Sequence, residues 1–192
     1  MSTPSPSPRK KKAVRKVTPE YLERVALWYM DRYAGSAASL ERVLTLRVRR
    51  SVRAHDTDPA EATAWVRTII EKHRAKGILD DARFAQNRAE NLHRRGTSLR
   101  MIRHRLAAKG IDPDTVRQVL DRMTEELPET EENPDLVAAI AFARRRRLGP
   151  FRPADQRQEK AQKDLAALGR AGFSGDIARK VILAKDTSDL IM

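Results

Sequence analysis

The chain has 192 residues, of which 40% are apolar and 34% charged, and 39 Lys and Arg against 26 Asp and Glu give it a formal charge of +13. It has no cysteine, no signal-peptide-like start and no apolar run of membrane-spanning length, which argues against disulfides, secretion and a membrane-spanning helix and favours a cytoplasmic protein. The positive charge favours a polyanionic partner such as nucleic acid, although a basic surface without any partner would have the same composition.

The first residues differ in composition from the rest of the chain. Residues 1–16 alternate Ser or Thr with Pro and then carry six Lys and Arg without an acid. Such a segment cannot bury enough apolar surface to order itself. Residues 1–17 are therefore predicted to form a disordered basic arm.

From residue 18 onward, apolar residues recur at helical spacing and no strand-like alternation is found. Thr18 followed by a proline starts a first helix, and a break at Gly35 precedes a second. Asp58 followed by a proline starts a third helix, which ends at Gly77. The sequence therefore predicts an all-α protein.

Two adjacent carboxylates, Asp80 and Asp81, raise the question of acid–base catalysis. With Asp80 as the N-cap, Asp81 is the first helical residue, where the helix dipole favours its charge. Leu79 and Phe84 then occupy the two positions of a hydrophobic staple. Adjacent helical residues do not face each other, so the carboxylates cannot easily converge on one reacting atom. We interpret both aspartates as a helix start and expect a protein that is not an enzyme.

An internal repeat is visible in the second half of the chain, where LAAKGIDPDTVRQVL (residues 106–120) matches LGRAGFSGDIARKVI (residues 168–182). Both segments contain the glycine and the following apolar residue of a Schellman helix ending. With a fainter match in the first third, this indicates tandem three-helix repeats, about nine helices in all, in an elongated, curved array. The predicted segments are residues 1–17 (basic arm), 18–77, 78–127 and 134–185 (three-helix repeats 1 to 3), 128–133 (acidic linker) and 186–192 (C-terminal tail).

Three stretches resemble the RecX family of recombination regulators: GILDDARFAQNRA (residues 77–89), RRGTSLRMIRHRLAAKGID (residues 94–112) and DLAALGRAGFSGDIARKVI (residues 164–182). The resemblance covers about residues 18–185. It implies an all-helical array that binds the RecA recombinase, chiefly its filament on DNA. It also implies inhibition of the ATPase, co-protease and strand-exchange activities of RecA, without catalytic residues, metal or cofactor. Members of the family have also been described as binding DNA directly.

Two other functions stay open. The chain could be a sequence-independent DNA-binding module whose effect on recombination arises from competition for DNA, or a helical scaffold for an unrelated acidic protein. The sequence favours the RecA regulator, and we expect it to act as a monomer.

Two basic clusters supply the candidate residues for contact with RecA or DNA. The alternative interpretation is a solvated outer face for the first cluster and the attraction of cations to a helix C-terminus for the second. Neither cluster contains a residue pattern typical of base recognition. Contact with DNA should therefore be through phosphates, independent of sequence and sensitive to salt. The candidates are Arg94, Arg95, Arg100, Arg103, Arg105 and Lys109 in the first cluster, and Arg144, Arg145, Arg146, Arg147 and Arg152 in the second.

We expect the histidines and tryptophans to have structural roles and not to bind a metal or nucleobases. The histidines have no metal-ligand spacing and no cysteine to join them, so they are expected at the surface. Trp28 and Trp65 fall on apolar helical faces and are expected in the core. There is no Gly-rich phosphate loop and no nucleophile elbow. The four histidines are His55, His73, His93 and His104.

Overall fold

The computed structural model describes residues 13–125 and 133–190, and these residues contain helices but no strand. The predicted all-α fold is therefore confirmed. Within this part of the chain, no helix combines the length and the apolar character needed to cross a membrane. In chain order the helices are α1 (Pro19–Arg32), α2 (Ala37–Ala54), α3 (Pro59–Ala75), α4 (Asp81–Arg94), α5 (Leu99–Ala107), α6 (Pro113–Glu125), α7 (Pro134–Arg146), the short η1 (Gly149–Phe151), α8 (Ala154–Arg170), α9 (Gly175–Ile182) and the short η2 (Ser188–Leu190).

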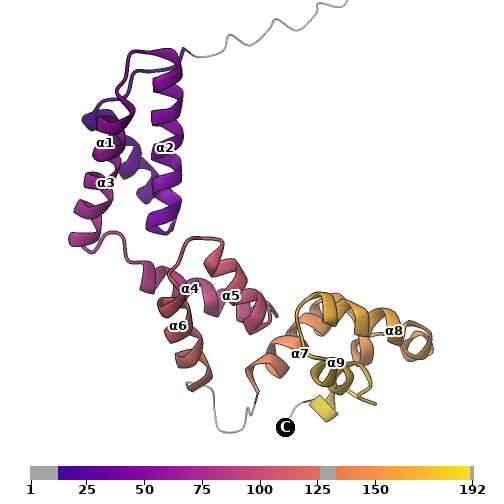
Figure 1. The fold of residues 1–192 in the computed structure, drawn as a ribbon. Helices are drawn as coiled ribbons and strands as arrows, with labels where there is room; N and C mark the ends of the chain where they lie inside the picture. Colours follow the sequence, from indigo (N-terminus) through magenta and orange to yellow (C-terminus); the bar gives the residue numbers. More distant parts are fainter. Residues whose placement is uncertain (1–12, 126–132, 191–192) are drawn as a thin grey trace, which may run out of the picture. The chain divides into compact units, whose positions relative to one another are not determined.

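The chain divides into two compact units, Met1–Leu79 and Asp80–Met192, and each is described by itself. In the first unit, α1, α2 and α3 pack side by side (Figure 1). Their facing sides bury Leu22, Leu40 and Leu44 completely. The apolar faces of the three amphipathic helices thus form one small core.

Side-chain caps begin α1 and α3 where the sequence predicted them. The side chain of Thr18 accepts a hydrogen bond from the first turn of α1, and that of Asp58 does the same for α3. Residues 1–12 of the expected basic arm lie outside the described residues. Residues 13–17 are described and contact the unit, since the backbone N–H of Val17 donates to Ser51 Oγ at 3.0 Å.

The prediction that both tryptophans lie in the core is wrong for Trp28, whose residue surface is 51% exposed. A helix turns by about 100° per residue, which directs Trp28 away from the face that buries Leu22 and Ala26. Trp65 is partly buried and packs against the core of the unit, as expected.

The prediction of surface histidines is wrong for His73, which is only 2% exposed. It lies one helical turn after Ile69, on the buried face of α3. Its Nε2 lies 3.1 Å from Glu23 Oε1, and the same oxygen accepts a hydrogen bond from Lys72 Nζ at 2.9 Å. A buried imidazole thus ties α3 to α1.

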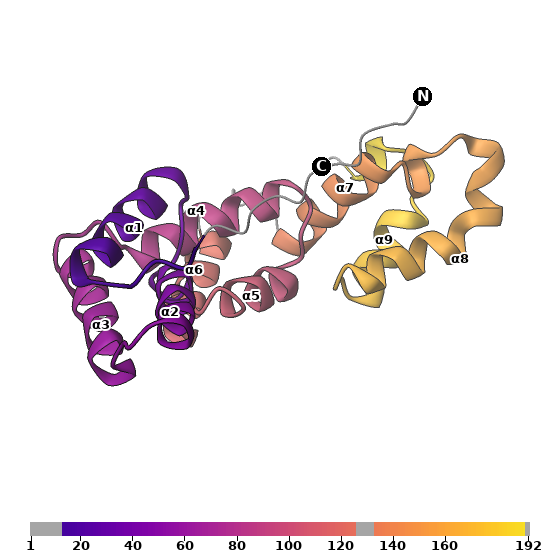
Figure 2. The same ribbon diagram turned by 90° about the horizontal axis from the view of Figure 1, so that it is seen from above.

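The second unit has two groups of helices, each with its own core. Ile102 and Leu106 are fully buried among α4, α5 and α6. Leu168 and Val181 are fully buried among α7, α8 and α9, whose packing is seen from above in Figure 2. The expected acidic linker falls largely outside the described residues, and the boundaries of the three repeats stay a prediction.

The start of α4 has the predicted cap. The side chain of Asp80 accepts a hydrogen bond from the backbone N–H of Arg83 at 2.9 Å, and Asp81 is the first residue of the helix. Leu79 belongs to the core of the first unit, whereas Phe84 packs against the core of α4–α6. The staple between these two side chains stays a prediction.

The two repeated Schellman endings are confirmed. The backbone N–H of Ile111 donates to the carbonyl of Leu106 at the end of α5, at 3.2 Å. At the end of α8, the N–H of Phe173 donates to the carbonyl of Leu168, also at 3.2 Å. The internal repeat in the sequence therefore corresponds to the same helix ending in two places, each followed by another helix.

Candidate functional site

Within the second unit, the group α4–α6 and the group α7–α9 are joined through helix ends. The backbone N–H of Leu99, the first residue of α5, donates to Asp135 Oδ1 in the first turn of α7 at 2.8 Å. Ser98 Oγ donates to the carbonyl of Ala171, just after α8, at 2.9 Å. These bonds satisfy helix-terminal groups that have no partner within their own helix.

The joint also depends on the close approach of Gly96 to α7. Gly96 has a φ of +74°, and a Cβ added there would lie 2.5 Å from the backbone nitrogen of Phe142 and 2.8 Å from the carbonyl oxygen of Ala138. Only glycine fits both the left-handed conformation and this distance. Because Gly96 has no side chain, the loop after α4 packs directly against the backbone of α7.

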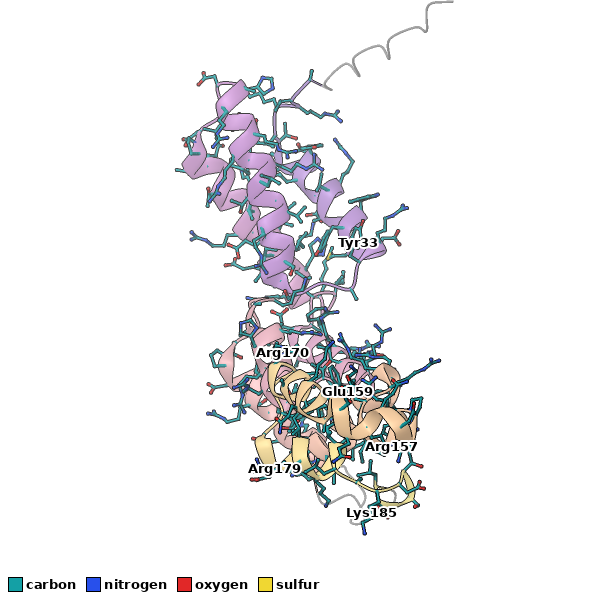
Figure 3. All side chains as sticks on the ribbon, turned by 90° about the vertical axis from the view of Figure 1, so that its right-hand side faces the viewer. Tyr33, Arg157, Glu159, Arg170, Arg179 and Lys185 are labelled. Carbon is teal, nitrogen blue, oxygen red and sulfur yellow. The ribbon has the colours of Figure 1, made fainter. Side chains whose placement is uncertain are left out.

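A hollow of about 520 Å³ lies at this joint. Residues of α4, α5, α7 and α8 and of the loops that follow α4 and α8 line it, and five of the lining residues are arginines while none is acidic. Arg170 is labelled in Figure 3. The lining residues are Leu92, Arg95, Gly96, Thr97, Met101, Arg105, Phe142, Arg145, Arg146, Ala167, Arg170 and Ala171.

Among the residues that the structure describes, no carboxylate neutralises the positive charge of the hollow. Across residues 13–125 and 133–190, none of its five arginines forms an ion pair. Two of them contact the ring of Phe142, with guanidinium carbons 6.0 Å (Arg145) and 5.0 Å (Arg146) from its centroid. Stacking leaves the in-plane N–H donors of a guanidinium available. The hollow therefore gathers five guanidinium groups that form no ion pair with any described residue, and guanidinium groups bind phosphates or carboxylates.

Comparison with known proteins assigns the chain to a family. The model of the RecX second three-helix domain matches residues 80–120. The regulatory protein RecX of Myxococcus xanthus is 43% identical over 172 residues, which cover 89% of each chain. The chain belongs to the RecX family. The regulatory protein RecX of Agrobacterium fabrum is 31% identical over 66% of this chain and 64% of that protein, and that of Halorhodospira halophila is 26% identical over 81% and 94%. No solved structure matches the chain significantly.

Four of the arginines predicted from the sequence line the hollow in this RecX-family chain. Arg95 and Arg105 come from the first cluster, and Arg145 and Arg146 come from the second. The fold thus brings together parts of two clusters that the sequence showed only as separate runs.

The other members of the first cluster do not line the hollow. Arg94 is exposed, and its Nη2 donates to Asn91 Oδ1 at 2.5 Å. Arg100 and Arg103, on α5, and Lys109, after α5, are also exposed. They belong to the same helical group as Arg95 and Arg105 but do not line the hollow.

Two members of the second cluster have local roles at the end of α7. Arg144 lies over the ring of Phe151, with its guanidinium carbon 5.6 Å from the centroid. Arg147 has a φ of +55° and ends the helix in the left-handed conformation. The N–H of Leu148 then donates to the carbonyl of Ala143 at 2.9 Å, so an arginine here occupies the position that glycine usually takes.

Arg152 is engaged inside the third group of helices. Its Nε and Nη2 donate to the two carboxylate oxygens of Asp164 at 3.2 and 3.0 Å. Asp164 is 2% exposed and also accepts a hydrogen bond from the backbone N–H of Gly149 at 3.0 Å. This bidentate ion pair joins the end of η1 to α8 and neutralises the charge of Arg152.

Arg170 is the residue of the hollow that the sequence analysis missed. It is a lone cation in the last turn of α8, a position where a positive charge is common because the helix dipole favours it. Local sequence contained no signal that set it apart. Arg170 lines the hollow because α8 packs against the loop that carries Ser98.

The histidines do not form a metal site in the part of the chain that the structure describes, where no group of three or more His, Cys, Asp or Glu side chains is placed to hold an ion. His93 Nε2 lies 2.7 Å from the carbonyl oxygen of Pro134, at the joint between the two helical groups. His93 is therefore a further link in the frame around the hollow.

Proposed function

We propose that this chain binds the RecA recombinase, chiefly as its filament on DNA, and inhibits the ATPase, co-protease and strand-exchange activities of that filament. Membership of the RecX family supports a regulatory role, because the matched relatives are named regulatory proteins. The observation that directs the proposal to particular residues is the hollow, which five arginines line and none of whose described lining residues is acidic. The chain acts by binding and not as an enzyme.

The physical basis of the proposal is electrostatic attraction at a preformed surface. The guanidinium groups of Arg145 and Arg146, which contact the ring of Phe142, lose less freedom than unsupported ones when they bind a carboxylate or a phosphate. A protein that contacts two neighbouring RecA subunits, or one subunit and the DNA, would hold them in one arrangement. That arrangement would oppose the movements that each cycle of ATP hydrolysis requires.

The test is the ATPase rate of RecA on single-stranded DNA with stoichiometric amounts of this protein. The wild-type chain is expected to lower the rate, and no effect would contradict the proposal. The double variant Arg145→Glu/Arg146→Glu, which reverses two charges in the hollow, is expected to lose most of the inhibition. The control Arg83→Glu/Arg88→Glu makes the same charge change at exposed positions of α4 outside the hollow and is expected to inhibit like the wild type.

A second candidate function is sequence-independent DNA binding, with any effect on RecA arising from competition for DNA. The hollow favours it because arginines without carboxylate partners suit phosphate oxygens, and because phosphate contacts carry no sequence information. Replacing one arginine that binds a phosphate should reduce the slope of log affinity against log salt by about 0.7 on single strands.

One comparison separates the two functions. DNA binding of the Arg145→Glu/Arg146→Glu variant is measured by fluorescence anisotropy, beside its inhibition of RecA. Loss of DNA binding with inhibition intact would exclude competition. Parallel loss of both, with the same dependence on salt, would favour competition over direct binding of RecA.

A further inference from the structure

The exposed face of α1 in the first unit carries a tryptophan between two arginines. Arg24, Trp28 and Arg32 are four residues apart, so they follow one another along the same face of the helix. Trp28 is 51% exposed although it is the largest residue of the helix, and both arginines are exposed. An indole left this accessible contributes little to the core of the unit.

Aromatic and cationic contacts hold the indole in place. The guanidinium carbon of Arg32 lies 6.0 Å from the centroid of the Trp28 ring. The ring of Tyr33, a residue labelled in Figure 3 and itself 50% exposed, approaches Trp28 edge-on, with centroids 6.0 Å apart and planes at 73°. Tyr29 contacts Tyr33 in turn, with centroids 5.4 Å apart. The indole thus lies in contact with neighbouring side chains at the surface.

The charges near this face indicate what kind of ligand it suits. Arg24 and Arg32 form no ion pair within residues 13–125 and 133–190, although Arg24 lies near enough to Glu20 for their charges to interact. The acids Glu20 and Asp31 lie on the same helix, which keeps the local positive charge modest. Phosphate attraction alone would therefore be weak here, and a ligand must also gain from the ring.

We propose that Trp28, flanked by Arg24 and Arg32, is a stacking site for an unpaired base of single-stranded nucleic acid. Every nucleobase has a flat π-face that stacks on an aromatic side chain, and flanking arginines contact the adjacent phosphates. Duplexes do not offer such a face, so the site selects single strands without reading their sequence. The proposal rests neither on RecA binding nor on the arginine hollow of the second unit.

The test uses the fluorescence of the full chain, because an indole is quenched when a base stacks on it. A short oligodeoxythymidylate is expected to quench the wild-type chain, and an abasic phosphodiester of the same length, which keeps the phosphates and lacks the bases, is expected not to. Trp28→Ala keeps Trp65 as a reporter of binding elsewhere. This variant should lose the quenching and bind the oligodeoxythymidylate on the order of 10-fold more weakly.

Two further variants control for the size of the change. Trp28→Phe keeps a stacking ring and is expected to retain most of the affinity. Leu46→Ala removes an apolar side chain of similar exposure, 49%, from α2 and is expected to bind like the wild type. Circular dichroism checks that all three variants stay helical.

Three results would overturn the proposal. Equal quenching by the abasic strand would show that phosphates alone are bound, and unchanged affinity of Trp28→Ala would show that the ring is not used. Normal nucleic-acid binding by Trp28→Ala together with loss of RecA binding would assign this face to a protein partner instead. The last result would leave the RecA proposal itself intact, so the two failures are distinguishable.

Discussion

Asp135 caps a helix other than its own: its Oδ1 accepts a hydrogen bond of 2.8 Å from the backbone N–H of Leu99, the first residue of α5. Asp135 itself lies in the first turn of α7. One carboxylate therefore stabilises the N-terminus of one helix by its hydrogen bond and that of another by its charge. The frame of the arginine hollow depends on such bonds between helix ends.

Asp135→Ala is expected to lower the free energy of unfolding by about 1 kcal/mol, the usual cost of removing an N-cap. Asp135→Asn keeps an oxygen acceptor for Leu99 and should cost less. Urea denaturation followed by circular dichroism measures both. Equal stability of Asp135→Ala and the wild type would mean that the bond contributes nothing to the joint.

Gly96→Ala should be more damaging, because a Cβ at this position would lie 2.5 Å from the backbone nitrogen of Phe142. Left-handed strain and overpacking together suggest a loss of about 3 kcal/mol. Gly77→Ala is the matched control: its φ is also positive, at +67°, but nothing lies within 4 Å of the added Cβ. It should cost only the strain, about 1 kcal/mol. A similar loss in both variants would show that the close approach to α7 is not tight.

Asp164→Ala is expected to destabilise the α7–α9 group by about 3–5 kcal/mol, because it leaves the partly buried guanidinium of Arg152 and the N–H of Gly149 without their acceptor. Thermal unfolding measures the loss. Arg152→Ala, assayed at a temperature where it is folded, should bind DNA like the wild type. A selective loss of DNA affinity in Arg152→Ala would show that Arg152 contacts DNA despite its pairing with Asp164.

Glu23 predicts a dependence of stability on pH. Burial raises the pKa of its carboxyl, but hydrogen bonds and charge from Lys72 and His73 outweigh burial and hold the pKa below its ordinary value of 4.5. Because the pKa is lower in the folded state, the stabilisation is present above the unfolded pKa and is lost as pH falls through the folded one.

The wild-type chain should therefore lose more stability on acidification below the ordinary glutamate pKa than Glu23→Gln, which has no carboxyl to protonate. Urea unfolding at a series of pH values, with both proteins side by side, measures this difference. Parallel pH profiles would show that the contacts of Glu23 with Lys72 and His73 do not favour its charged form.

The errors of sequence interpretation have a common cause. Trp28 was expected inside and is exposed, and His73 was expected outside and is buried. Neither prediction counted the helical rotation from the residues that are buried: Trp28 was assigned to an apolar helical face, and the histidines were placed at the surface because they lack metal-ligand spacing. At 100° per residue, the position of Trp28 relative to buried Leu22 predicts an exposed side chain. The position of His73, one turn after buried Ile69, predicts a buried one.

Helix starts and ends were determined by the sequence itself. Caps at Thr18, Asp58 and Asp80 and the Schellman bonds of Ile111 and Phe173 join groups a few residues apart, so the local sequence contains everything they need. The same stretches carry the resemblance to the RecX family, which the comparisons confirm.

Only the tertiary structure decided which cations act together. Arg95 and Arg170 lie far apart in the chain and line one hollow, while Arg152, close in sequence to the run that ends α7, is held by Asp164. The physical reason is that charge is a property of single residues, whereas the presence or absence of an ionic partner depends on packing between helices. Sequence shows how many arginines a chain has, and packing determines which of them remain free to bind.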